Sequence, residues 1–229
     1  MKVVAKIVFA LGLSLSASFA YGQEAELKRF RVLGYGDGFF EGVFFERMEA
    51  DEPVAVELGF MPNRKSQSYD VPESEDSVSF FRLEKGPHDS VKRVEVGRVR
   101  WPPRVERALL VFFEAEDFVE TGQYEILVLD ESPEVWKAGC FRFLNLSGAE
   151  LNCRLGEERF VLSHDESEIY SFDPESAGVM RLQLMVPWEG KNRLIYSTRV
   201  IPDKNYAKLL VIKPPIEEGS LQVRVENLW

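Results

Sequence analysis

The chain has 229 residues, of which 45% are hydrophobic, and its 28 basic and 38 acidic residues give a formal net charge of −10. This length is sufficient for two domains of ordinary size, each with its own core. A charge this negative argues against a nucleic-acid partner, because a phosphate backbone requires a basic face.

The first 22 residues have the composition of a secretory signal peptide. Lys2 and Lys6 form a basic start, Ile7–Leu15 is an apolar run, and small residues follow. This order is typical of a signal removed after Ala20 or Gly22. About a dozen apolar residues are too few to cross a bilayer core of about 30 Å. We therefore expect an exported protein, periplasmic or extracellular, with no transmembrane anchor.

Short alternating segments, separated by turn residues, follow the signal. Gly34–Gly38 has three glycines in five residues and predicts a tight turn. Within Val91–Arg100 the apolar positions fall out of step, which predicts a β-bulge near Gly97. The strands expected in this half include Lys28–Leu33, Pro53–Phe60, Ser77–Leu83 and Val91–Arg100.

One stretch is written twice, about 100 residues apart. Glu106–Glu131 has an apolar run, an acidic bend with Gly and an alternating strand, and Tyr206–Glu226 repeats this order. In each copy the two strands predict an antiparallel pair. The openings also match, since Phe30–Gly34 reads FRVLG and Phe141–Asn145 reads FRFLN. We therefore expect two units of one type.

The predicted fold class is all-β, with two tandem immunoglobulin-like antiparallel β-sandwiches after the signal peptide. About seven short strands per unit, with Gly, Pro, Asp and Ser between them, are typical of such a sandwich. The expected boundaries are a signal peptide at 1–22, a first sandwich at 27–130, a linker at 131–139 and a second sandwich at 140–229. Because the linker is short, we expect the sandwiches to sit close together, with Trp136 between them.

Two cysteines, Cys140 and Cys153, lie 13 positions apart. An oxidising compartment would favour a disulfide between them, worth about 3 kcal/mol for a loop of this size. The alternative is two buried thiols on neighbouring strands. The sequence leaves both open.

Groups that could carry catalysis or hold a metal are sparse. His88 and His164 lie in polar turns, and a catalytic triad needs convergence in space that sequence adjacency does not create. The Cys and His spacing does not match a zinc site, and the acidic bend after Phe113 lacks the pattern of a calcium loop. We therefore expect a protein that is not an enzyme, with no catalytic residue, no metal ligand and no cofactor.

Aromatic side chains are the remaining candidates for a binding surface. Their faces can stack on sugar rings or receive a partner's side chains, while filling the core is the competing role. The candidates are Phe39, Phe40, Phe44, Phe45, Trp101 and Trp188. They favour a protein partner in the cell envelope, with a polysaccharide as the second choice.

The segment Phe141–Leu162, FRFLNLSGAELNCRLGEERFVL, resembles bacterial exported proteins with tandem immunoglobulin-like domains. The resemblance covers about a tenth of the chain and implies only a fold and an exported location. The chain is also similar to periplasmic pilus chaperones in its signal, length and two domains. That family lends a strand to an incomplete partner and uses a basic pair in its cleft, whereas the corresponding strand here, Leu109–Phe113, is uncharged.

The expected function is therefore a non-enzymatic exported binding or structural module that associates with another cell-envelope protein. A carbohydrate-binding protein that uses exposed aromatics is one alternative. A chaperone-like strand donor is the other.

Overall fold

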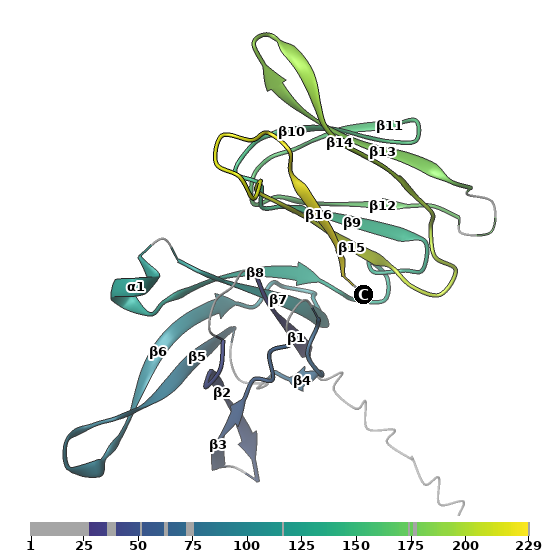
Figure 1. Ribbon diagram of the computed structural model, residues 1–229. Coiled ribbons are helices and arrows are strands. Elements are labelled where there is room, and N and C mark those ends of the chain that lie inside the picture. Colours follow the sequence, from purple (N-terminus) through teal and green to yellow (C-terminus); the bar gives the residue numbers. More distant parts are fainter. Residues whose placement is uncertain are drawn as a thin grey trace, which may run out of the picture.

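The computed structural model describes residues 28–35, 40–50, 52–61, 64–71, 76–115, 117–173, 175 and 178–228. Within these ranges the chain forms sixteen strands in four sheets of four strands each (Figure 1). Helical structure there is limited to the 3₁₀ turn η1 (Pro87–Asp89) and the single turn α1 (Phe118–Thr121). The all-β prediction is confirmed. The expected signal peptide and Phe39 lie outside the described residues.

The first eight strands form a sandwich of two sheets, with the orders β4-β1-β7-β8 and β3-β2-β5-β6. We call it the N-terminal sandwich. Its strands are β1 (Arg29–Gly34), β2 (Phe44–Glu49), β3 (Glu52–Glu57), β4 (Tyr69–Asp70), β5 (Ser77–Lys85), β6 (Val91–Arg100), β7 (Arg107–Glu114) and β8 (Tyr124–Asp130).

The last eight strands form the C-terminal sandwich, with the orders β12-β9-β15-β16 and β11-β10-β13-β14. Its strands are β9 (Cys140–Asn145), β10 (Leu151–Leu155), β11 (Glu158–Leu162), β12 (Ser167–Ser171), β13 (Met180–Trp188), β14 (Lys191–Val200), β15 (Lys208–Lys213) and β16 (Arg224–Leu228). Adding eight to each strand number of the N-terminal sandwich reproduces this order, so the two halves share one topology.

The repeated sequence elements occupy equivalent places in the two sandwiches. The predicted hairpins form the antiparallel pairs β7–β8 and β15–β16. The matching openings form β1 and β9, which run parallel to β7 and β15 in the same register, since Val32 pairs with Leu110 and Phe143 with Leu210. The predicted bulge near Gly97 is confirmed, and β14 has a bulge at the equivalent place, at Ile195.

The structure corrects three details of the predicted fold. Each half has eight strands rather than about seven, and one pair in each half is parallel rather than antiparallel. In an immunoglobulin sandwich the second strand lies between the first and the fifth, whereas here β2 lies between β3 and β5. The immunoglobulin-like part of the prediction is therefore not confirmed. Strand number and spacing do not determine which strands pair, and pairing defines the topology.

Side-chain alternation along the strands fills each sandwich. In the N-terminal sandwich, Phe30 of β1 and Phe45 of β2 face each other across the two sheets, with ring centroids 5.0 Å apart. In the C-terminal sandwich, Phe143 of β9 faces inward with Leu184 of β13 and Ile212 of β15. Residues of the opposite parity therefore point out of these sheets.

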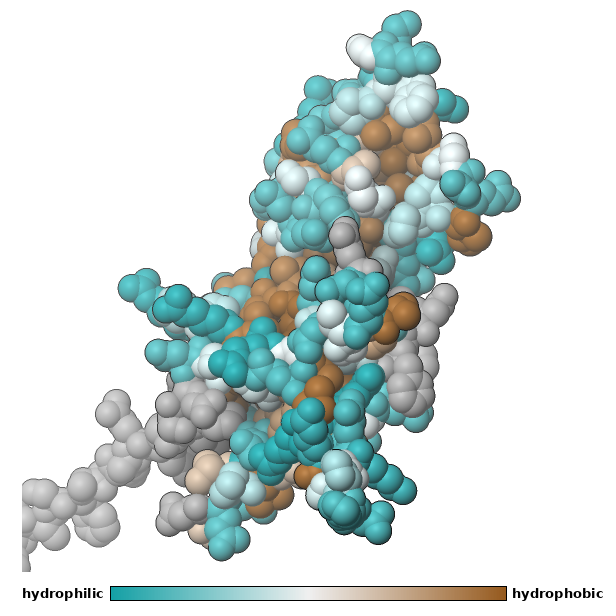
Figure 2. Space-filling model, turned by 90° about the vertical axis from the view of Figure 1, so that its left-hand side faces the viewer, coloured by the Kyte–Doolittle hydropathy of each residue, from teal (hydrophilic) through white to brown (hydrophobic). Residues whose placement is uncertain are grey.

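A third apolar cluster, which we call the junction, joins the two sandwiches. The outer faces of the β1 and β9 sheets pack against each other, so that four sheets are stacked (Figure 1). The core of the junction is made of Leu33, Leu109, Val111 and Leu129 from one half and the equivalent residues Leu144, Leu209, Val211 and Leu228 from the other, together with Leu146. Figure 2 shows hydrophobic side chains at this level, between largely hydrophilic outer parts.

Candidate binding pocket at the junction

The predicted aromatic residues do not form one surface. Phe40 and Phe45 are buried in the N-terminal core, and Phe40 stacks on Phe60 and Tyr124. Trp101 is only 4% exposed, and its Nε1–H donates a hydrogen bond of 2.8 Å to a backbone carbonyl. These three candidates fill the core because inward positions of β-strands need large apolar side chains.

The other aromatic candidates lie apart from one another. Phe44 is half-buried and stacks on Phe81, with the ring centroids 6.0 Å apart. Trp188 is 46% exposed at the end of β13, beside the turn to β14. The aromatic residues therefore offer isolated contacts rather than a shared binding face.

Both cysteines are free, buried thiols. Cys140 begins β9 and Cys153 lies in β10, in the opposite sheet of the C-terminal sandwich. A disulfide can join the two sheets of a sandwich, as in antibody domains, but here the two sulfur atoms are not bonded to each other. The disulfide alternative is therefore not found, and the sulfur of Cys140 instead lies 3.0 Å from the hydroxyl oxygen of Ser171.

We expect both thiols to react slowly with Ellman's reagent in the native protein. Burial raises the pKa of Cys153 to about 12, so almost none of the reactive thiolate is present near neutral pH. After the protein is unfolded in guanidinium without a reductant, two thiols per chain should react with Ellman's reagent. No reactive thiol after unfolding would show that the cysteines are bridged.

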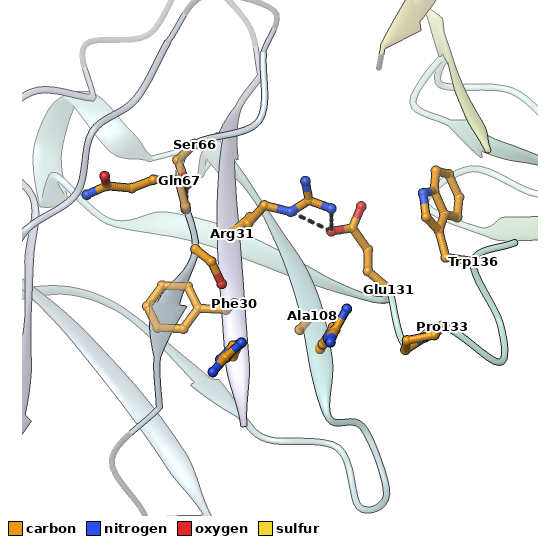
Figure 3. Close-up of a pocket in the computed structure, with 11 residues that line it drawn as sticks. Phe30, Arg31, Ser66, Gln67, Ala108, Glu131, Pro133 and Trp136 are labelled. Atoms are coloured by element: carbon orange, nitrogen blue, oxygen red, sulfur yellow. Dashed lines mark hydrogen bonds and ion pairs between the residues drawn. The ribbon is translucent and has the colours of Figure 1, made fainter. Parts of the chain in front are cut away.

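A pocket of about 540 Å³ opens beside the junction (Figure 3). Strands β1 and β7 form one side of the pocket. The segment before β4 forms a second side, and the connection from β8 to β9 forms a third. Its lining includes Arg29, Arg31, Ser66, Arg107, Glu131 and Trp136. Ser66 is held against β1 by two hydrogen bonds of 2.9 Å with the backbone of Val32.

Glu131 is the buried centre of this pocket, with a side chain only 2% exposed. Its Oε2 accepts hydrogen bonds of 2.8 and 3.1 Å from Arg31, and its Oε1 accepts one of 2.6 Å from Lys65. Figure 3 shows Arg31 and Glu131 pointing at each other, with Trp136 beyond them. One carboxylate therefore balances two cations that come from different parts of the N-terminal sandwich.

Two cations contact the ring of Trp136. The Lys65 ammonium lies 4.7 Å from its ring centroid and the Arg142 guanidinium 5.0 Å. Burial lowers the pKa of Lys65 and of Arg142, and the nearby Glu131 carboxylate opposes the shift in both. Because Arg142 belongs to β9, these contacts fix the connection between the sandwiches to both of them.

The rim of the pocket carries excess positive charge. Arg29 and Arg107 are register partners on the parallel strands β1 and β7. Arg29 pairs with the exposed Asp70 at 3.2 Å, whereas Arg107 is exposed and has no ion pair within the described residues. Glu131 is the one carboxylate among the described lining residues, and its oxygens are already occupied. This arrangement can accept a further anionic group.

The sequence interpretation missed this pocket. Lys65 and Glu131 lie 66 positions apart and converge only through the fold, and no local pattern marks Lys65. A signal did exist in the repeated opening, because Arg31 and Arg142 occupy the same outward position of β1 and β9. A charged residue repeated at an equivalent position of two strands, directly between apolar neighbours, indicates a shared polar contact.

Other classes of site have no support in the described part of the chain. No three His, Cys, Asp or Glu side chains there are placed to hold a metal ion. None of its helices has the length and hydrophobicity of a membrane span. His164 accepts a hydrogen bond of 3.2 Å at Nδ1 from the backbone N–H of Gly148, in an exposed turn.

The comparisons with known proteins add no assignment. The chain matches no model of a known protein family, and no curated protein is significantly similar to it.

Proposed function

We propose that the protein is a non-enzymatic binding module of the cell envelope that holds an acidic segment of a partner protein in the junction pocket. The observation that carries this proposal is that Arg29 and Arg107 are register partners at the rim of this pocket. The one carboxylate among the described lining residues, Glu131, is already occupied by Arg31 and Lys65. A carboxylate of the partner would give Arg107 the counterion that Asp70 already gives Arg29.

The chemistry of the pocket favours a carboxylate beside an apolar side chain. Guanidinium groups bind carboxylates through two parallel hydrogen bonds, and of the three arginines that line the pocket Arg107 is the one without an ion pair among the described residues. Trp136 and Pro133 supply an apolar wall next to it. Since the chain as a whole has a net charge of −10, an acidic segment would be repelled from most of the remaining surface.

The strand-donor alternative finds less support. The strand expected to act in a chaperone, β7, is paired with β1 on one side and β8 on the other, so it has no free edge to lend. The aromatic alternative is weakened by the burial of Phe40, Phe45 and Trp101. We therefore favour recognition by charge over both.

The test is binding of a short peptide of alternating Glu and Leu, followed by calorimetry, with a Gln–Leu peptide as the uncharged probe. We expect binding of the acidic peptide only, and Arg107→Gln should weaken it about tenfold or more, the loss of one charge-assisted hydrogen bond. The matched control is Lys85→Gln, an exposed cation near the β5–β6 turn. Equal weakening by both substitutions, or equal binding of both peptides, would overturn the proposal.

A further inference from the structure

The outer face of the sheet β11-β10-β13-β14 is rich in arginine. Residues of one parity, such as Cys153 and Leu184, point into the C-terminal core. Residues of the other parity point away from it. The sheet belongs to the layer of the C-terminal sandwich farthest from the junction (Figure 1), so this face is separate from the junction pocket.

Strand register places the arginines next to one another. Arg159 of β11 pairs with Arg154 of β10, which pairs with Gln183 of β13. Two residues before Gln183 in β13, and therefore on the same face, Arg181 pairs with Arg199 of β14. Four guanidinium groups on three adjacent strand pairs therefore share one face of a chain whose net charge is −10.

These arginines have little internal compensation. Like charges directly opposite each other destabilise a sheet. Arg154 donates from Nε to the carbonyl oxygen of Gly156 at 2.8 Å and lies 3.5 Å from Glu157. Within the described residues, Arg159, Arg181 and Arg199 have no ion pair, and all three are exposed. The face carries a repulsion that a bound anion would remove.

A groove of about 480 Å³ runs over the same face and adds neutral hydrogen-bonding groups. Its lining includes the side-chain amides of Asn152, Gln183 and Asn192, beside Arg154 and Arg159. Amides donate and accept hydrogen bonds, which suits hydroxyl groups, while guanidinium groups suit carboxylates. Hydroxyls and carboxylates alternating along one polymer are the chemistry of a polysaccharide built from uronic acids.

We propose that this face, which we call the arginine face, binds an acidic polysaccharide laid across the strands. Neighbouring strands lie about 4.8 Å apart, a spacing similar to the length of one sugar ring, so successive rings would meet successive strands. Single-stranded nucleic acids are bound largely by stacking of their bases on aromatic side chains, and the outward-facing lining residues described for this groove include no aromatic ring. A flat anionic bilayer could not fill the groove. The proposal is independent of the peptide-binding function proposed for the junction pocket.

The test measures binding to polygalacturonate by calorimetry, with neutral dextran as the uncharged polymer. The double variant Arg159→Gln/Arg199→Gln is compared with Lys85→Gln/Lys92→Gln, which removes the same charge from exposed positions on the β5–β6 hairpin. We expect the wild-type and control proteins to bind polygalacturonate and not dextran, and the arginine variant to bind at least about tenfold more weakly.

Three results would overturn the inference: equal losses in both double variants, no binding of polygalacturonate by the wild-type protein, or binding confined to anionic lipid vesicles or single-stranded DNA. Arg107→Gln should leave polygalacturonate binding unchanged, and the arginine-face variant should still bind the Glu–Leu peptide. A failure of one site is thereby distinguished from a failure of the other.

Discussion

Replacing Glu131 with Gln will lower the free energy of unfolding by about 3–5 kcal/mol, as expected when one partner of a buried ion pair is removed. Glu131 and Lys65 have side chains only 2% and 5% exposed, so the substitution leaves the Lys65 ammonium buried beside Arg31 without a counterion. Urea denaturation followed by circular dichroism measures the change. Asp70→Asn, which breaks the exposed pair with Arg29, should cost less than about 1 kcal/mol.

A companion variant separates the charge effect from lost packing. Replacing both partners, Lys65→Met with Glu131→Leu, removes this buried ion pair as a unit, while the Arg31 side chain is 40% exposed and can be hydrated, so the double variant should recover much of the lost stability. If Glu131→Gln costs no more than Asp70→Asn, Glu131 is solvated and the ionic centre described for the junction pocket does not form.

Replacing Leu144 with Ala will lower the free energy of unfolding by about 2–5 kcal/mol, the usual cost of truncating a fully buried leucine. Leu144 points out of its own sandwich, and it is buried only because the N-terminal sandwich covers it. The control is Leu194→Ala, a leucine of β14 that is 51% exposed and whose truncation should change stability by less than about 0.5 kcal/mol. Equal, small effects would mean that the two sandwiches do not pack face to face.

The duplicated architecture could be predicted because short, continuous segments of the sequence carry its pattern. The hairpins β7–β8 and β15–β16, the matching openings of β1 and β9, and the bulge near Gly97 each leave a pattern within one short, continuous stretch of the chain. Strand order could not be predicted in the same way, because the parallel pairing of β1 with β7 joins segments that lie far apart in the chain.

The junction left a signal that the sequence interpretation did not use. Leu109–Phe113 is a continuous apolar run rather than an alternating one, and such runs are typical of strands buried on both faces. In the structure one face of β7 meets the N-terminal core and the other meets the C-terminal sandwich. A strand of this kind in a predicted sandwich indicates that a further layer of protein covers the outer face of its sheet.

The candidate site was harder to predict than the fold. The sequence points to aromatic residues as binding candidates, but in a β-sandwich the inward positions take the largest rings, as Phe45 shows. The pocket depends instead on charged residues such as Lys65 and Glu131, which are ordinary polar residues in the sequence. Their role follows only from burial and from the neighbours that the fold brings to them.

The most direct test of the junction pocket as the binding site is a nuclear magnetic resonance titration of isotope-labelled protein with the Glu–Leu peptide. We predict that the Trp136 indole N–H and the backbone amides of Arg29 and Arg107 shift together and saturate at one affinity. The same shifts should be absent in the Arg107→Gln variant. Shifts confined to the β13–β14 hairpin around Trp188, or no shifts at saturating peptide, would contradict the proposal.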